Sequence, residues 1–224
     1  MVQYIWIGIL SLNFCFNFDD VFAQKPYYGH YIKIGKSKNK SFLSIKEICI
    51  QDYRLFVEIT KRKYGDTSEQ YKFLIPDTAK FRALYGFPFF LPAGYSKNKE
   101  TDDLLMMHWE FPMVAISYEQ ALAYCQWESE AWKQSKYVWQ YSLPTQSNYE
   151  SVLKKAKITK NKALSPFQRK GYNYVWGLTD NVAEYTQDGM VVEGGENTVL
   201  KFVEAKDCEN PIGFRIKATK ISKN

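Results

Sequence analysis

Histidine and cysteine are scarce in this chain, which has two His and four Cys among 224 residues. The two histidines, His30 and His108, stand far apart, and no Cys-x-x-Cys pair occurs. Zinc ribbons and thioredoxin-type redox sites both need closely spaced cysteines, so both classes are excluded. A Ser-His-Asp hydrolase has no supporting motif either.

Glycine and proline are also few, at 12 and 8 residues, and the chain has no internal repeat or low-complexity segment. Aromatic residues are abundant instead, with 17 Tyr, 15 Phe and 6 Trp. Such side chains bury large areas and can hold irregular loops through their polar tips. The length suits one well-filled core, so we expect a single domain over residues 24–224.

The N-terminal apolar run "IWIGILSLNFCFNF" is short for a membrane-spanning helix, and "VFA" precedes Gln24. This pattern predicts a signal peptide over residues 1–23, with no membrane span after its cleavage. We therefore expect an exported protein that is periplasmic, outer-membrane-associated or secreted. The alternative is an uncleaved anchor, because "MVQY" lacks the usual Lys or Arg.

Export would leave three cysteines, Cys49, Cys125 and Cys208, in a compartment that permits disulfides. An odd number allows at most one bridge among them, and the sequence leaves its pairing open. The formal charge of +6 comes partly from lysine runs at 33–40 and 154–162. These runs are typical of solvated loops, so no nucleic-acid partner is expected.

Helical patterns come before extended ones along the chain. The later part of 44–63 predicts an amphipathic helix capped by Ser44 or Asp52. The residues near helical spacing are Ile48, Asp52, Leu55, Phe56 and Ile59. A second helix over 117–134 starts with a capping box, and a third begins within 143–156. Beyond 171 the pieces "YNYVWGL", "MVVEGG", "VLKFVEA" and "IGFRIKA" are short and extended. This order indicates an α+β fold.

Five further segments occur in one order: "FPMVAISYEQALAYCQWESE", "YSLPTQSNYESV", "DNVAEYTQD", "EGGEN" and "GFRI", after an upstream "KEICIQDYRLF". Together they resemble the formylglycine-generating enzyme family, also called the sulfatase-modifying factor domain, over about residues 28–218. The segments "FLIPDTAKF" and "FFLPAGY" look most like its branch among gliding-motility lipoproteins of Bacteroidota. The resemblance implies a formylglycine-generating-enzyme fold, a compact α+β variant of the C-type lectin fold with much irregular structure.

The resemblance also implies a structural calcium ion at the Asn-Val-x-Glu loop. Carried over residue by residue, its ligands would be Asp180, Asn181, the carbonyl of Val182, and Glu184. Calcium takes six to eight oxygen ligands, which a polar loop can offer. The alternative is that Asn181 and Glu184 satisfy backbone groups in a tight turn. Asp180 stands where the family usually has Gly.

Catalysis in the family uses copper held by two cysteine thiolates before Gly-Phe-Arg, or, in a second branch, iron held by three histidines. This chain has only Cys208 between positions 186 and 212, and only two histidines in all. One sulfur cannot reproduce a two-thiolate Cu(I) site. We therefore expect neither a copper nor an iron site.

The expected function is accordingly a non-catalytic binding or scaffold module at the cell envelope, with an envelope protein or a glycan as partner. The alternative is a formylglycine-generating oxidase acting on a cysteine of a sulfatase, in which Cys208 would be the catalytic residue. Trp109, Trp139 and Trp176 could contact a ligand, although core packing is the more common use of tryptophan.

Overall fold

The computed structural model describes residues 31–34, 40–91, 110–131, 138–154, 157–159, 174–179, 181–194 and 199–221. The helices are α3 (Ile50–Tyr64), α4 (Glu69–Leu74), α5 (Thr78–Tyr85), α7 (Tyr118–Ala131), α8 (Gln146–Leu153) and the 3-10 turn η3 (Ala205–Asp207). The strands are β1 (Tyr31–Ile34), β2 (Ser41–Ser44), β3 (Val138–Ser142), β4 (Lys157–Thr159), β5 (Tyr174–Trp176), β6 (Ala183–Tyr185), β7 (Met190–Gly194), β8 (Leu200–Glu204), β9 (Ile212–Gly213) and β10 (Lys217–Ile221).

Two four-stranded sheets and a short parallel pair make up the described β structure. The first sheet has the order β1-β2-β10-β3, the second has the order β8-β7-β6-β9, and β4 pairs with β5. All pairings in the first sheet are antiparallel. Helix and sheet are both substantial, which confirms the mixed α+β class expected from the sequence.

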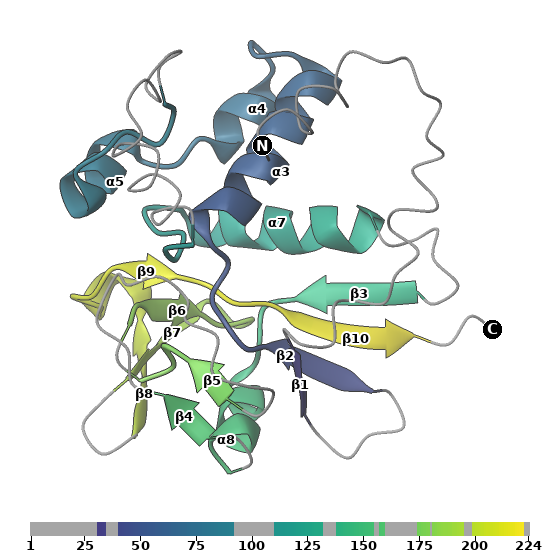
Figure 1. Cartoon of the computed structure of the whole chain (residues 1–224), viewed down its shortest axis with the longest axis vertical. Helices are drawn as coiled ribbons and strands as arrows, with labels where there is room; N and C mark the ends of the chain where they lie inside the picture. Colours follow the sequence, from purple (N-terminus) through teal and green to yellow (C-terminus); the bar gives the residue numbers. More distant parts are fainter. Residues whose placement is uncertain are drawn as a thin grey trace, which may run out of the picture.

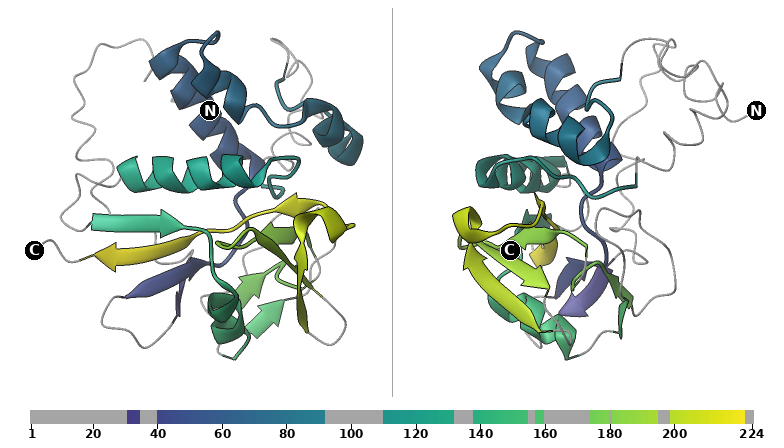
Figure 2. Two further views of the ribbon diagram at one scale, coloured as in Figure 1. Left: turned by 180° about the vertical axis from the view of Figure 1, so that it is seen from behind. Right: turned by 90° about the vertical axis from the view of Figure 1, so that its left-hand side faces the viewer.

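Helices α3, α4 and α7 lie on one side of the first sheet (Figure 1). Helix α7 runs along β3 and β10, and α3 and α4 lie beyond it on the side away from the sheet. The second sheet, the β4–β5 pair and α8 lie on the opposite side from α3 and α4, as both views of Figure 2 show. None of the described helices combines the length and the apolar character needed to cross a membrane.

The first sheet joins segments that are far apart in the sequence. Strand β10 lies between β2 and β3, with Ala218 opposite Phe42 on one side and Tyr141 on the other. The expected order of early helices and late strands is therefore incomplete, because β1 and β2 precede the first described helix. These two strands are four residues each, too short to give a distinct alternating pattern.

The first helix differs from its prediction in both its cap and its buried face. Its N-cap is Cys49, whereas Ser44 lies in β2 and Asp52 lies inside the first turn. Leu55 and Ile59 are exposed. The buried face consists of Ile50, Tyr53, Phe56, Val57 and Thr60. Phe56 of the predicted stripe is buried, and the rest of the stripe differs because α3 packs against both α4 and α7, with Phe56 facing Tyr124 and Trp127.

The other two helix starts follow the sequence prediction. At α7, the backbone N–H of Gln120 donates to Ser117 Oγ (3.2 Å), and Ser117 N–H donates to Gln120 Oε1 (2.7 Å), which is the predicted capping box. At α8, the N-cap is Thr145, whose N–H donates to Asn148 Oδ1 at 3.0 Å. Both helices are thus capped at their N-terminal ends by residues three positions apart.

An aromatic cluster fills the space between the helices and the first sheet. Tyr53 is fully buried at its centre, and its hydroxyl donates to the carbonyl of Leu74. Its ring contacts those of Phe56, Phe89, Tyr124 and Phe214. Trp139 is 4% exposed, so for this residue core packing is confirmed as the use. Aromatic packing therefore joins α3 and α7 to the segments that hold Phe89 and Phe214.

Strand β7 passes so close to the segment before the 181–184 loop that Gly194 has no room for a side chain. A Cβ atom there would lie 1.9 Å from the carbonyl oxygen of Thr179. We predict that Gly194→Ala lowers the free energy of unfolding by roughly 3 kcal/mol or more, since backbone atoms would have to move. The matched control is Gly189→Ala, where φ is +80° but no atom lies within 4 Å. It should cost only about 1–2 kcal/mol, as measured by urea denaturation. Equal losses for the two variants would contradict the close approach.

Candidate functional site

The most distinctive group of polar residues is buried where the chain passes from the second sheet to the first. Arg215 lies between β9 and β10 and is 0% exposed. Its Nε donates to Glu184 Oε2 at 2.6 Å and its second terminal nitrogen donates to Oε1 at 2.5 Å. Glu184, in the middle of β6, is 1% exposed. The two side chains form a bidentate ion pair that joins the two sheets.

A second carboxylate, that of Glu47, lies beside this pair. Glu47 stands in the connection between β2 and α3, and its Oε1 is 3.8 Å from the Arg215 guanidinium. The same oxygen accepts a hydrogen bond from Asn181 Nδ2 at 3.0 Å. Gly177, at φ +65°, allows this contact, because a Cβ there would lie 2.1 Å from Glu47 Oε1. Glu47 thus links the loop to the connection between β2 and α3.

Two further contacts complete the network. The hydroxyl of Tyr149, on α8, donates to Glu184 Oε2 at 2.9 Å. Arg215 also donates from its other terminal nitrogen to the carbonyl of Ser44, at the end of β2. We call Glu47, Tyr149, Asn181, Glu184 and Arg215 the arginine network. Its members come from four separate segments of the chain.

Charge in the arginine network is unbalanced, because two carboxylates face one guanidinium. Burial opposes the charge of Arg215, but Glu184 and then Glu47 raise its pKa above the ordinary value. Burial raises the pKa of Glu47 to about 7, with Arg215 opposing the shift and the carboxylate of Glu184 adding to it. Burial and then Glu184 raise the pKa of Tyr149. Glu184 thus forms the bidentate pair with Arg215, and Glu47 is the carboxyl group whose pKa rises to about neutral pH.

The calcium ligands expected from the sequence are only partly placed by the structure. Asp180 lies outside the described residues. Asn181, Val182 and Glu184 are all buried, at 8%, 5% and 1% exposure. Asn181 and Glu184 both face the arginine network. No group of three or more His, Cys, Asp or Glu side chains suited to a metal ion occurs within the described ranges. The calcium site stays a prediction.

The three described cysteines occupy three different environments and are all unbridged. Cys49 donates to Asp52 Oδ2 at 3.0 Å, and burial raises its pKa to about 12. Cys125 is 3% exposed on the core side of α7, and burial raises its pKa further still. Cys208 follows η3, and its thiol donates to Glu193 Oε1 at 2.9 Å. Burial and then this hydrogen bond raise the pKa of Cys208 to about 12.

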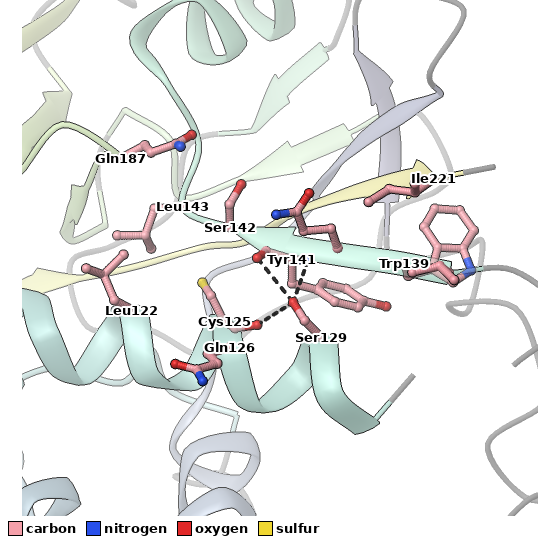
Figure 3. Close-up of a pocket in the computed structure, with 12 residues that line it drawn as sticks. Leu122, Cys125, Gln126, Ser129, Trp139, Tyr141, Ser142, Leu143, Gln187 and Ile221 are labelled. Atoms are coloured by element: carbon pink, nitrogen blue, oxygen red, sulfur yellow. Dashed lines mark hydrogen bonds between the residues drawn. The ribbon is translucent and has the colours of Figure 1, made fainter. Parts of the chain in front are cut away.

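A groove of about 440 Å³ lies between α7 and β3, the edge strand of the first sheet (Figure 3). Leu122 and Ile221 line it as half-exposed apolar side chains. Ser129 crosses from α7 to the strand, where its hydroxyl accepts from the N–H of Tyr141 at 2.8 Å (Figure 3). The helix thereby takes part of the hydrogen-bonding capacity of the strand edge. Among the described residues that line the groove, Cys125 and Tyr141 are the titratable ones. Burial raises the pKa of both side chains, so the groove suits binding better than proton transfer.

Sequence reasoning found the loop but missed most of its partners. It identified Asn181 and Glu184, whereas the roles of Glu47, Tyr149 and Arg215 went unnoticed. Arg215 stands in the segment "GFRI", which contributes to the sequence argument only through the family resemblance. A single Arg among apolar residues near the end of a buried strand is a usable signal, because Arg is almost never fully buried unless it is paired. His30, His108, Trp109 and the side chain of Trp176 lie outside what the structure describes.

The fold and the arginine network define an α+β domain in which a polar loop is fixed by a buried ion pair between two sheets. Residues 37–189 match the family model described as "Sulfatase-modifying factor enzyme 1-like domain". That match covers more than half of the chain, and the chain belongs to this family. No curated protein sequence matches it at a significant level.

The raised pKa of Glu47 predicts that stability depends on pH. A carboxyl group whose pKa is about 7 in the fold and 4.5 in the unfolded chain binds its proton more tightly when folded. The free energy of unfolding should therefore rise as pH falls from 8 to 5, by roughly 2 kcal/mol from this group. Glu47→Gln should remove this contribution and should be more stable than the native chain at pH 8.

The measurement is urea denaturation of the native chain and of Glu47→Gln at several pH values between 5 and 8.5. The matched control is Glu204→Gln, whose side chain is 60% exposed and which should keep the native pH profile. A pH profile of Glu47→Gln parallel to that of the native chain would show that Glu47 is ionised throughout.

Proposed function

We propose that this chain is an exported, non-catalytic member of the sulfatase-modifying factor family that acts as a binding or scaffold module at the cell envelope. The observation that carries the proposal is that Cys208 has no second cysteine beside it in its segment. It is the single cysteine between positions 186 and 212, where the resemblance implies a pair of copper thiolates. A one-thiol segment lacks the ligand set that selects Cu(I).

The environment of Cys208 also opposes thiolate formation. The metal ligand and nucleophile is the deprotonated sulfur, and reactive cysteines have positively charged surroundings that lower their pKa. The thiol of Cys208 instead donates a hydrogen bond to the carboxylate of Glu193, which also accepts a hydrogen bond from Asn210 Nδ2 at 3.0 Å. With a pKa raised to about 12, the group remains a thiol at neutral pH.

The other two cysteines are engaged elsewhere. Cys49 is bonded at the N-terminus of α3 and Cys125 packs on the core side of α7. The raised pKa of each supports the same conclusion as Cys208. Should the chain be an oxidase, Cys208 would be its catalytic residue, and a second sulfur would have to come from another molecule.

Binding is the remaining use that the fold supports. A rigid aromatic core carries long connections, and segments positioned in this way commonly form recognition surfaces. The partner we propose is an envelope protein or a glycan, at the periplasm, the outer membrane or outside the cell. The segments "FLIPDTAKF" and "FFLPAGY" favour the gliding-motility lipoprotein branch as the setting. A C-type-lectin-like arrangement of the fold would suit either partner.

We predict that the purified protein does not generate formylglycine. Incubation with Cu(I), oxygen and a peptide containing Cys-x-Pro-x-Arg should leave the peptide cysteine unchanged, as measured by mass spectrometry. The same assay on a Cys208→Ser variant provides the matched control. Aldehyde formed by the native chain and lost in Cys208→Ser would refute the non-catalytic proposal and would establish the oxidase alternative.

We also predict that the mature protein begins near Gln24. N-terminal sequencing of the protein isolated from its native envelope fraction checks this expectation directly. A start at Gln24 or Lys25 would support cleavage after the small-residue pattern at the end of "VFA". Intact Met1 in a membrane fraction would instead support the uncleaved anchor.

A further inference from the structure

The arginine network bears directly on whether the 181–184 loop holds a divalent cation. The family resemblance implies calcium at this loop. Calcium requires six to eight oxygen ligands with lone pairs free to face the ion. Whether the residues present can supply such a set depends on what their oxygens already contact.

Glu184 is the one carboxylate among the described candidate ligands, and both of its oxygens are already in use. Oε1 accepts from Arg215, and Oε2 accepts from Arg215 and from the hydroxyl of Tyr149. Each contact is a charge-assisted hydrogen bond in a fully buried environment. A calcium ion on Glu184 would have to displace at least one of these donors.

Asn181 is committed in a similar way. Its amide nitrogen donates to Glu47 Oε1, and this contact fixes which side of the amide faces the second carboxylate. Its backbone N–H donates to the carbonyl of Gly177 at 3.3 Å. The groups nearest the two carboxylates are therefore hydrogen-bond donors, N–H and O–H, whose positively polarised hydrogens repel a metal cation.

A fixed positive charge also stands at the place where the ion would be attracted. The guanidinium of Arg215 lies within 3.8 Å of both Glu47 and Glu184. A second cation in the same buried space would face like-charge repulsion that little solvent could screen. Among the described residues of this loop, the side chains of Asn181 and Glu184 therefore do not fit a calcium ion.

We propose that Arg215 supplies, from within the chain, the positive charge that a calcium ion would supply to the 181–184 loop, so that this loop is held without a divalent cation. This inference concerns the loop alone and does not rest on the proposed binding function. It assigns Arg215 and Glu184 to the role of an internal ion pair, with Tyr149 and Asn181 orienting the two carboxylates.

The first experiment uses the native full chain without substitution. Its melting temperature, Tm, is measured after chelator treatment, with and without millimolar calcium, alongside calcium titration calorimetry. A site filled about a hundredfold above its dissociation constant would raise Tm by roughly 5–10 °C in a chain of this size. We expect no such shift and no binding heat. A calcium-dependent rise that Glu184→Gln abolishes would overturn the proposal.

The second experiment removes the internal charge. Arg215→Met keeps much of the side-chain length but leaves Glu184 buried without a cation, so we expect its Tm to fall by roughly 10 °C or more. Millimolar calcium should raise the Tm of this variant, because the vacated charge can then be supplied from outside. Arg215→Lys retains a positive charge and should stay insensitive to calcium.

The matched control for these variants is Arg62→Met, which removes an exposed arginine from its pair with Glu58. Its Tm should change by no more than about 2 °C, since exposed pairs contribute little. An Arg215→Met variant with a Tm equal to that of Arg62→Met would contradict the proposal. If Arg215→Met does not fold, the calcium response of the native chain and of Arg215→Lys still decides the question.

Discussion

The ion pair between Arg215 and Glu184 is the interaction on which the rest of this structure depends. Arg215 lies in the step that carries the chain from β9 in the second sheet to β10 in the first. The backbone on either side of it is bonded to the start of the chain, because Phe214 and Ile216 accept from Ile48 and Ser44. Breaking a buried pair of this kind by removing one partner costs about 3–5 kcal/mol, much of the stability of a typical domain.

Close packing around the pair follows from the same constraint. Two buried carboxylates and a guanidinium can be tolerated only if their remaining hydrogen-bonding groups are satisfied nearby. The loop and strands therefore approach closely enough that Gly177 and Gly194 have no space for a side chain. These contacts explain the Asn and Glu of the loop sequence, since both side chains face the network.

Local signals in the sequence predicted the elements that depend on local interactions. The capping box at Ser117 and the Thr145 start of α8 involve residues three positions apart, and both were found. The predicted cap of α3 and most of its predicted buried face were wrong. Packing against α4 and α7, which are distant in the sequence or follow it, decides which face of the helix is buried. Most of the arginine network could not be predicted by such reasoning. Glu47 and Asn181 are separated by 134 positions, and no local pattern indicates that they meet.

The same distinction applies to function. The family match concerns residues 37–189, whereas Cys208 and Arg215 both lie beyond it. Membership of the family therefore concerns the domain as a whole, and whether the chain binds a metal or catalyses a reaction depends on the residues beyond position 189. There the thiol of Cys208 donates a hydrogen bond to Glu193, and the guanidinium of Arg215 donates hydrogen bonds to Glu184. In both places a hydrogen bond within the protein occupies a group that the family resemblance assigns to a metal. On the proposals made above, these internal contacts hold the two segments where relatives would use a metal ion.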